Sequence, residues 1–468
     1  MANSRFEHDF LGERILPDDA YYGIQTLRAL ENFHITGIPI NTEPIFVQAL
    51  AYVKKAAALA NRDLGVLDPA IADAIVRACE RVASGEFDHQ FLTDMIQGGA
   101  GTSVNMNANE VIANVALEIM GHPKGAYEFC HPNNHVNCSQ STNDAYPTAF
   151  RIALSNKLVG YSKTLEELAD AFAAKGREFR NILKMGRTQL QDAVPMSMGD
   201  EFRAFATNLR EELLRIDDSR NLIAEINMGA TAIGTQVNAP AGYAELVTKY
   251  LREVTGLNLV LAGDLIEATY DTGAYVQLSG VLKRTAVKLS KICNDLRLLA
   301  SGPRAGLFEI NLPPLQPGSS IMPGKVNPVV PEVVNQTAFY VIGADLTVTM
   351  AAEAGQLQLN VMEPVISFAL FTSISYMTNA CRTLTEKCVN GITANAAHAE
   401  EQVRRSIGIV TQLNPIIGYE TASEIAKEAL RTGKSVHDIV VTERQLLTQK
   451  KWDEIYTFEN MIRPAFIQ

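Results

Sequence analysis

The chain has little cysteine, no cluster of basic residues and no long apolar run. Its six cysteines are scattered over 468 residues, which does not indicate a disulfide framework. Because Asp and Glu (52) outnumber Lys and Arg (41), the net charge is −11, which excludes a general electrostatic surface for nucleic acid. No apolar stretch approaches the ~18 residues of a membrane span, and the N-terminus has no apolar leader core. These absences predict a cytoplasmic protein with neither membrane nor nucleic-acid partners.

What is abundant is apolar sequence with a helical period. Three segments without proline repeat apolar residues every three or four positions, and each runs for roughly 25 to 30 residues. Their seams are Leu154, Leu158, Tyr161, Leu165, Leu168 and Phe172; Phe202, Ala206, Leu209, Leu213 and Ile216; and Leu278, Leu282, Leu289, Ile292 and Leu296. Helices of this length, roughly 40 Å each, pack as a bundle. A fourth segment, about 331–360, is apolar on most sides and is predicted to be buried.

The predicted fold class is mainly α, with a central long-helix bundle and two smaller domains. The bundle is placed at 144–396, after a mostly helical N-terminal domain at 1–143 and before a small helical C-terminal domain at 397–468. The alternation of strands and helices that is typical of a parallel sheet is not visible. Seams this long exceed what one chain covers, so we expect an oligomer; a self-contained bundle is the alternative.

The stretch 318–328, Gly-Ser-Ser-Ile-Met-Pro-Gly-Lys-Val-Asn-Pro, places reactive groups in a loop. Its glycines and prolines disfavour regular structure, yet it carries two hydroxyls, one cation and one amide. A phosphate loop is excluded by spacing: five residues, where a Walker A loop has four, separate Gly318 from Gly324, and Val326 stands where a hydroxyl is needed for magnesium. The loop therefore indicates an anion-binding site beside a reactive side chain.

Three other polar clusters interrupt the helical pattern, at 98–107, 139–144 and 186–192. Each is rich in hydroxyls and amides, and glycines free backbone N–H groups in two of them. Any one of them is typical of a helix cap or a turn. Four clusters at the ends of long helices, however, predict one pocket that binds carboxylates through many hydrogen bonds.

Two further patterns are interpreted as incidental. The segment 130–138 contains two Cys and two His, but their spacing matches no standard zinc site, so no metal is predicted. Ala-Ser-Gly, the precursor of the prosthetic group of aromatic ammonia-lyases, occurs at 83–85 in a charged surface stretch and at 300–302 where a helix ends. Neither position suits a cofactor.

Together the four clusters resemble the active-site segments of the aspartase/fumarase superfamily. Residues 318–328 are similar to the superfamily signature, the other three occur in the family's order, and the similarity extends through essentially the whole chain. The resemblance implies a long-helix bundle that forms a homotetramer, with each active site shared between three subunits. The segment 130–138 is similar to a secondary anion-binding loop of the family, with Asn134 in place of the usual Asp.

The resemblance also implies the residues of the site. Ser319 corresponds to the general base that removes a proton from Cβ of the substrate. No cofactor is implied, because the substrate's own carboxylate accepts the electrons. The implied substrate-binding residues are Thr102, Ser141, Thr142, Asn143, Thr188, Gln189, Ser320, Lys325 and Asn327.

Within the superfamily, several positions are similar to those of aspartate ammonia-lyases. Thr142 stands where fumarases tend to have Ser, Glu363 where they usually place Lys, and Gln189 where they carry His. Loss of hydroxide from malate needs an acid such as His, whereas the ammonium of aspartate leaves as ammonia without one. The implied reaction is the reversible conversion of L-aspartate to fumarate and ammonia. A fumarate hydratase, another substituted-succinate lyase and a catalytically dead helical scaffold are the alternatives.

Overall fold

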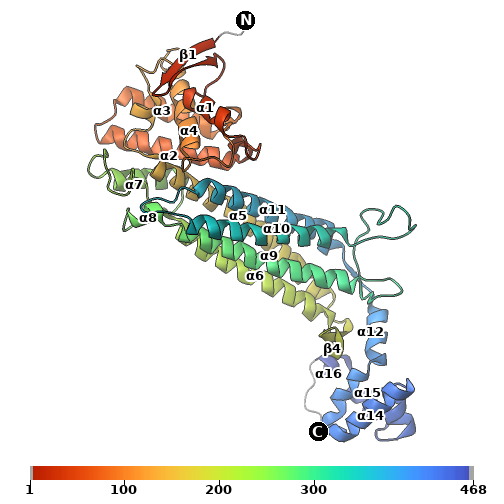
Figure 1. Cartoon of the computed structure of the whole chain (residues 1–468). Helices are drawn as coiled ribbons and strands as arrows, with labels where there is room; N and C mark the ends of the chain where they lie inside the picture. The colour runs from red at the N-terminus through yellow and green to blue at the C-terminus, as the bar shows by residue number, and fades with distance from the viewer. Residues whose placement is uncertain (1–3, 463–468) are drawn as a thin grey trace. The chain divides into compact units, whose positions relative to one another are not determined.

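The computed structural model describes residues 4–462, and most of them are helical (Figure 1). Its five long helices are α5 (Thr142–Glu178), α6 (Met198–Ile223), α9 (Gly273–Leu299), α10 (Val329–Glu353) and α11 (Glu363–Lys387). The three predicted seams lie within α5, α6 and α9. The mainly α fold class is therefore confirmed.

The fourth apolar segment is shorter and more exposed than predicted. It forms α10, in which the side chains of Phe339, Leu346 and Met350 are 62%, 62% and 64% exposed. The helix is apolar on most sides, but its neighbours in the same chain cover only part of it. The prediction of burial is therefore wrong for the single chain. Although α10 is apolar, no helix in the described part of the chain combines the length and apolarity needed to cross a membrane.

The described residues form two compact units. Unit 1 consists of the described parts of Met1–Ser162, Leu214–Arg284 and Phe339–Met377, and unit 2 of those of Lys163–Leu213, Thr285–Ala338 and Thr378–Gln468. The division into three domains that the sequence suggests stays a prediction.

Unit 1 contains the shorter elements that precede α5 and those that lie between α6 and α9. They are β1 (Ser4–Asp9), β2 (Gly12–Pro17), α1 (Ile24–Asn32), α2 (Pro44–Asp63), α3 (Pro69–Ala83), α4 (Thr102–Ile119), β5 (Glu225–Ile226), α7 (Tyr243–Thr255), β6 (Val260–Leu261) and α8 (Glu267–Tyr270). An aromatic core connects α2 with the long helices: Phe46 packs against Tyr146, Phe150 and Phe371. The Tyr146 hydroxyl also lies 3.0 Å from Ser367 Oγ on α11. These contacts fix the beginning of α5.

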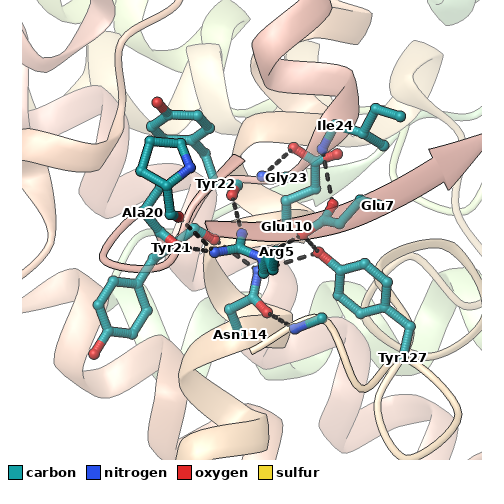
Figure 2. A network of polar contacts seen from close by, with 12 residues as sticks. Arg5, Glu7, Ala20, Tyr21, Tyr22, Gly23, Ile24, Glu110, Asn114 and Tyr127 are labelled. Atoms are coloured by element: carbon teal, nitrogen blue, oxygen red, sulfur yellow. Dashed lines mark hydrogen bonds and ion pairs between the residues drawn. The ribbon is translucent and has the colours of Figure 1, made fainter. Parts of the chain in front are cut away.

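Two buried carboxylates, from Glu7 of β1 and Glu110 of α4, hold the first turn of α1 in place (Figure 2). Glu110 of α4 accepts hydrogen bonds from the backbone N–H groups of Gly23 at 2.8 Å and Thr26 at 3.1 Å, and Glu7 accepts one from Ile24 at 2.9 Å. Negative charge is favourable at a helix N-terminus. A Cβ atom at Gly23 would lie within 2.8 Å of both carboxylates, so only glycine fits there. Burial raises the pKa of Glu110 to about 7, against the hydrogen bonds it accepts.

Unit 2 contains a hairpin and a C-terminal helical core. Its shorter elements are β3 (Leu183–Thr188), β4 (Gln191–Ser197), β7 (Ile310–Asn311), β8 (Thr393–Ala394), α12 (Ala396–Arg405), α13 (Asn414–Ile417), α14 (Tyr419–Thr432), α15 (Gln449–Ile455) and α16 (Phe458–Ile462). Leu183 and Met185 of β3 belong to the same buried cluster as Leu413, Ile425 and Trp452. The C-terminal core therefore anchors the base of the β3–β4 hairpin.

Candidate active site

Four of the predicted substrate-binding residues lie where two helices of unit 1 begin. Thr102 is the first residue of α4, and Ser141–Asn143 spans the start of α5. The two starts are adjacent, because Asn105 Nδ2 on α4 donates a hydrogen bond to Thr142 Oγ1 at 3.2 Å. Helix N-termini offer free N–H groups and a favourable dipole to anions. We call Thr102 and Ser141–Asn143 the helix-end cluster; it has the character of a carboxylate site.

Gly101 allows the two helix ends to approach each other. Its φ of +90° lies in the left-handed region that favours glycine. A methyl group at this position would also overlap the ring of Tyr146 on α5. The glycine-rich stretch before Thr102 thus has a packing reason as well as a conformational one.

The start of α5 is capped by Ser141 and Asp144. Asp144 Oδ1 accepts a hydrogen bond from Ser141 N at 2.9 Å, and its Oδ2 accepts from Gly229 N at 3.1 Å and Thr231 N at 2.9 Å. Asp144 thus makes one of the two bonds of a capping box, whereas the Ser141 hydroxyl oxygen accepts from Asn143 N at 3.3 Å. Burial raises the pKa of Asp144 to about 6, although these hydrogen bonds and the charge of Lys54 favour its carboxylate form. The cap fixes Ser141–Asn143, the part of the helix-end cluster at the start of α5.

Asn143 is oriented by its own hydrogen bonds. Its Nδ2 donates to the carbonyl oxygen of Ala232 at 2.8 Å, and its backbone carbonyl accepts from Asn227 Nδ2 at 3.0 Å. Because a carbonyl oxygen only accepts, the amide nitrogen of Asn143 must face Ala232. Its Oδ1 therefore points the other way, where it can accept a hydrogen bond from an ammonium group.

A fully buried lysine supports the helix-end cluster. The ammonium of Lys54, on α2, donates to Asn105 Oδ1 at 2.7 Å, Asn137 Oδ1 at 3.0 Å and Gln140 Oε1 at 2.8 Å. Burial lowers the pKa of Lys54 to about 7, and the charge of Asp144 opposes this shift. All three of its hydrogen-bond partners are neutral amides. A buried ammonium is costly to maintain, which points to a role beyond packing.

Reasoning from the sequence missed Lys54. The available signal was a lysine in an apolar helical seam, four residues after Leu50 and seven before Asn61. That signal does not separate a buried lysine from a solvated one. The adjacent Lys55 illustrates the point, because it lies on the same helix and pairs with the exposed Glu80 at 2.7 Å.

Thr188 and Gln189 lie at the exposed tip of the β3–β4 hairpin in unit 2. Thr188 pairs with Gln191, so Gln189 and Leu190 form a two-residue turn with φ values of 54° and 62°. Two positive φ values define a type I′ turn, which favours Asn-Gly. Residues with side chains cost about 1–2 kcal/mol each in this region. Strain retained at an exposed tip indicates a functional position.

Buried ion pairs hold the base of this hairpin. Glu309 has no exposed side-chain surface, and its oxygens lie 2.6 Å from an Arg187 guanidinium nitrogen and 2.9 Å from Lys184 Nζ. The second guanidinium nitrogen of Arg187 donates to Gln402 Oε1 at 3.1 Å. Because Arg187 directly precedes Thr188, these contacts fix where the hairpin tip begins.

The 318–328 loop is closed by hydrogen bonds between its ends. Gly318 N donates to the carbonyl oxygen of Lys325 at 2.7 Å, and Asn327 Nδ2 donates to the carbonyl oxygen of Gly318 at 2.7 Å. A Cβ atom at Gly318 would lie 2.8 Å from the Lys325 oxygen, so this closure requires glycine. In this conformation the predicted substrate-binding amide of Asn327 holds the loop.

Ser319 accepts two backbone hydrogen bonds within the loop. Its Oγ accepts from Ile321 N at 3.2 Å and from Met322 N at 3.0 Å. Two such donors stabilise negative charge on the oxygen. Ser319 and Lys325 line one surface hollow of about 480 Å³, whereas Ser320 is exposed. The structure thus brings the predicted base and the predicted cation together.

The hairpin residues are not part of this arrangement. Thr188 and Gln189 do not line the hollow that contains Ser319 and Lys325. The helix-end cluster belongs to unit 1, and the hairpin and the loop belong to unit 2. The shared site that the sequence predicts therefore stays a prediction.

The histidines of the segment 130–138 are fixed by backbone donors. His131 Nδ1 accepts hydrogen bonds from Asn133 N at 3.0 Å and Asn134 N at 3.3 Å, and His135 Nδ1 accepts from His131 N at 2.8 Å. Burial lowers the pKa of both rings. Neutral rings offer an anion little attraction. Within residues 4–462, no three His, Cys, Asp or Glu residues are grouped to hold a metal ion.

Comparison with known proteins gives consistent results. A family model described as Lyase matches residues 12–343, and one described as Fumarase C C-terminus matches residues 409–463. The chain is 58% identical over 460 residues to an aspartate ammonia-lyase from Helicobacter pylori, covering 98% of both chains. It is also similar to the structure of a fumarate lyase:delta crystallin from Brucella melitensis bound to cobalt, with a TM-score of 0.94, 52% identity and 99% of both chains covered. A class II fumarase from Schistosoma mansoni has a TM-score of 0.93 but 35% identity, over 99% of this chain and 100% of its own.

Proposed function

The chain belongs to the aspartase/fumarase superfamily of lyases, and from this premise we propose that it catalyses the reversible elimination of ammonia from L-aspartate to give fumarate. The observation that carries this conclusion is its similarity, over nearly the full length, to proteins named aspartate ammonia-lyase. The enzyme is accordingly a carbon–nitrogen lyase.

The chemistry sets one main electrostatic task for the site. A base removes the proton from Cβ, and the electron pair moves into the adjacent carboxylate, which becomes a doubly charged aci-carboxylate. When this intermediate collapses, the Cα–N bond breaks, the double bond of fumarate forms and neutral ammonia leaves. Donors placed in advance around the carboxylate lower the barrier, as in an oxyanion hole. No electrophilic cofactor is needed, because the carboxylate itself accepts the electrons.

We assign the helix-end cluster to this carboxylate. Thr102, Ser141 and Thr142, together with the backbone near Ser320, are its proposed donors. Two helix N-termini support this assignment, because their N–H groups and dipoles stabilise the added charge without rearrangement. The proposed contacts of the α-carboxylate are Thr188, Lys325 and Asn327. Those of the amine are Asn143, Thr102 and Gln189.

We assign Ser319 as the general base. A serine alkoxide is normally too basic to persist near neutral pH, so it needs stabilisation. The two loop N–H groups that donate to Ser319 Oγ supply part of it, and the charge of Lys325, which lines the same hollow, supplies more. The proton taken from Cβ then remains on Ser319 until it passes to solvent.

Gln189 favours cleavage of the C–N bond. An amide can hydrogen-bond the departing amine but cannot donate a full proton to a leaving hydroxide. Its strained position at the hairpin tip presents this amide to solvent in the single chain. A fumarate hydratase or another substituted-succinate lyase is the second candidate, because the fold is shared with a class II fumarase.

We further propose a cytoplasmic homotetramer in which three subunits contribute to each active site. The exposed apolar side chains of Phe339, Leu346 and Met350 on α10 support assembly, because they need cover that the single chain does not provide. Light scattering should give four times the 51.1 kDa chain mass. Refolding Ser319→Ala together with Thr188→Ala in equal amounts should restore about a quarter of the sites, because intact residues then meet from different subunits. A complete failure to restore activity would show that each chain builds its own site.

Fumarate formation tests the reaction directly. The purified enzyme is given L-aspartate and then L-malate, and the conjugated double bond of fumarate is followed by ultraviolet absorbance. We expect turnover of aspartate and only background with malate. A Ser319→Ala preparation made in parallel measures any contaminating host enzyme. Turnover of malate alone would identify a fumarase, and inactivity toward every substituted succinate would indicate a structural scaffold.

A further inference from the structure

The amide of Asn105 lies between a buried cation and a predicted substrate-binding hydroxyl. Its Oδ1 accepts a hydrogen bond from Lys54 Nζ at 2.7 Å, and its Nδ2 donates to Thr142 Oγ1 at 3.2 Å. Lys54 and Asn105 are 0% and 1% exposed, and Thr142 is 9% exposed. The three residues come from α2, α4 and the first turn of α5, so tertiary packing alone brings them together.

Lys54 determines which way this amide points. In its ammonium form, whose three N–H groups match the three amide oxygens around it, Lys54 has only donors, so the atom of Asn105 that faces it must be the oxygen. The NH2 group then faces Thr142, whose hydroxyl oxygen must act as the acceptor. Without the cation, the oxygen and nitrogen of the amide are nearly equivalent in shape, and the group is able to turn over. In the turned amide, the Asn105 oxygen would face Thr142 and accept a hydrogen bond from its hydroxyl.

The surrounding amides make this direction rigid. Asn137 Oδ1 accepts from Lys54 at 3.0 Å, from Asn105 Nδ2 at 3.2 Å and from Asn109 Nδ2 at 3.1 Å. Gln140 Oε1 accepts the third hydrogen bond of Lys54 at 2.8 Å. Asn105, Asn137 and Gln140 thus present their oxygens to the ammonium and their nitrogens elsewhere. Thr142 is the last residue in this series of hydrogen bonds. Within the described residues, its hydroxyl makes no hydrogen bond other than the one it accepts from Asn105.

We propose that Lys54 and Asn105 are positioning residues that act through Thr142 and commit its hydroxyl proton to a substrate carboxylate. The inference rests on the proposed function, because it takes Thr142 as a contact of the dicarboxylate. A threonine hydroxyl has one proton, and the bond it accepts from Asn105 leaves that proton for the ligand. The carboxylate that becomes doubly charged gains most from a donor whose direction is fixed in advance.

Asn105→Asp tests the direction with almost no change in shape. The aspartate keeps an oxygen toward Lys54 and gains an ion pair there, but it presents a second acceptor to Thr142. The Thr142 hydroxyl then donates to Asp, and its proton is lost to the substrate. We expect kcat/KM for L-aspartate to fall about 10- to 100-fold, the effect of one hydrogen bond to a charged group, with most of the loss in kcat. The Tm at fixed protein concentration should change little, because the new ion pair with Lys54 offsets the hydrogen bond lost to Asn137.

A double-mutant cycle with Thr142→Ala separates this effect from general electrostatics. If Asn105 acts through the hydroxyl, Asn105→Asp should reduce kcat/KM by less than about two-fold once Thr142 is replaced by alanine. In Thr142→Ser, which keeps the hydroxyl, the full loss should return. Equal losses in both backgrounds would overturn the proposal, because the new charge would then be acting directly. An active Asn105→Asp enzyme would overturn it as well.

Asn109→Asp is the matched control. It places the same substitution one turn along α4, on an amide that contacts Asn137 but not Thr142. Its effect on kcat/KM should be the same whether or not Thr142→Ala is also present, so these two substitutions should be additive. If Asn105→Asp does not fold, Asn105→Ala is used in its place. It should lower kcat/KM about 3- to 10-fold on its own and leave kcat/KM unchanged when Thr142→Ala is also present. A loss that persists there would overturn the proposal.

The result also distinguishes this inference from the proposed function. If Thr142→Ala retains full activity, Thr142 is not a substrate contact, and the positioning role fails while aspartate turnover stands. If the unmodified enzyme does not convert aspartate, the proposed function itself fails. If Thr142→Ala loses activity but the cycle is additive, only the positioning role is overturned.

Discussion

The helix-end cluster and the 318–328 loop are held in opposite ways. Asp144 and Lys54, which support the helix-end cluster, are fully buried and bound by several elements. The loop, in contrast, is largely exposed, and its described hydrogen bonds join its own residues to one another or to the first turn of α10. The first region is therefore organised before any ligand arrives. The second has the freedom to move onto one.

This difference fits a division of labour. Binding and charge stabilisation require groups whose positions are fixed in advance, and buried networks provide them. A base that must be covered to exclude water is better placed on a segment that closes over bound substrate. Each region can be perturbed separately, and the expected effects differ in kind.

The largest effect is expected from Ser319→Ala in the loop. Removing the only group assigned to take the Cβ proton should lower kcat at least ~10³-fold. Because the loop contributes little to the buried core, the Tm and the oligomer mass should be unchanged. Steady-state kinetics and light scattering measure both. Retained activity would remove Ser319 as the base, and a lost oligomer would give the loop a structural role instead.

A pair of glycine substitutions compares the two regions directly. Gly101→Ala should destabilise the protein by roughly 3 kcal/mol, because φ is +90° and the methyl group meets the Tyr146 ring. Gly324→Ala has a similar φ of +80°, but nothing lies within 4 Å of its Cβ, so only about 1 kcal/mol is expected. Chemical denaturation at fixed protein concentration gives both values. Equal losses would mean that packing at the helix ends matters no more than packing in the loop.

The pH dependence of stability should reveal the buried Lys54 ammonium. Its pKa is lowered to about 7 in the folded protein, from 10.5, so between these values the unfolded chain binds more protons. Folding stability therefore rises with pH in this range, by up to about 1.4 kcal/mol per unit for this group. Between pH 7 and 9, the Tm of the unmodified protein should therefore rise relative to the Tm of Lys54→Met.

Lys55→Met is the control for this measurement, because it removes the neighbouring lysine that pairs with the exposed Glu80. A constant Tm difference between the unmodified protein and Lys54→Met across the range would contradict the lowered pKa of Lys54.

The smallest effect is expected at the hairpin tip. Leu190 is 71% exposed and has a φ of 62°, a conformation that asparagine tolerates better. Leu190→Asn should raise stability by roughly 0.5–1 kcal/mol and leave the kinetics unchanged, whereas Leu190→Ala should bring no gain. Calorimetry and the fumarate assay check the two parts. A drop in kcat/KM would show that the turn itself, and not only Gln189, contributes to the reaction.

Much of the fold could be predicted from the sequence, because long helices leave a local, periodic signal. The seams of α5, α6 and α9 are visible at a period near 3.6 residues, and each lies within one helix. The exposure of α10 was not predictable in the same way. An apolar surface shows that a helix needs cover, but not whether the same chain supplies it.

The candidate site was predicted less completely. The polar clusters identified the residues of the helix-end cluster and of the 318–328 loop because hydroxyls and amides are conspicuous between apolar seams. The residues that hold these clusters in place gave almost no recognisable signal in the sequence. Lys54 reads as a surface lysine, and Glu309, whose carboxylate pairs with Arg187, reads as an ordinary acidic residue before a loop.

By itself, the sequence determined the helices, the residue types available for catalysis and, through Gln189, the absence of a titrating acid at one position. Only the tertiary structure decided that α2, α4 and α5 converge, so that Lys54 orients Asn105 and Asn105 orients Thr142. The physical reason is range. Helical periodicity is set by neighbours three or four residues apart, whereas the direction of a buried hydrogen bond depends on groups that only folding brings into contact.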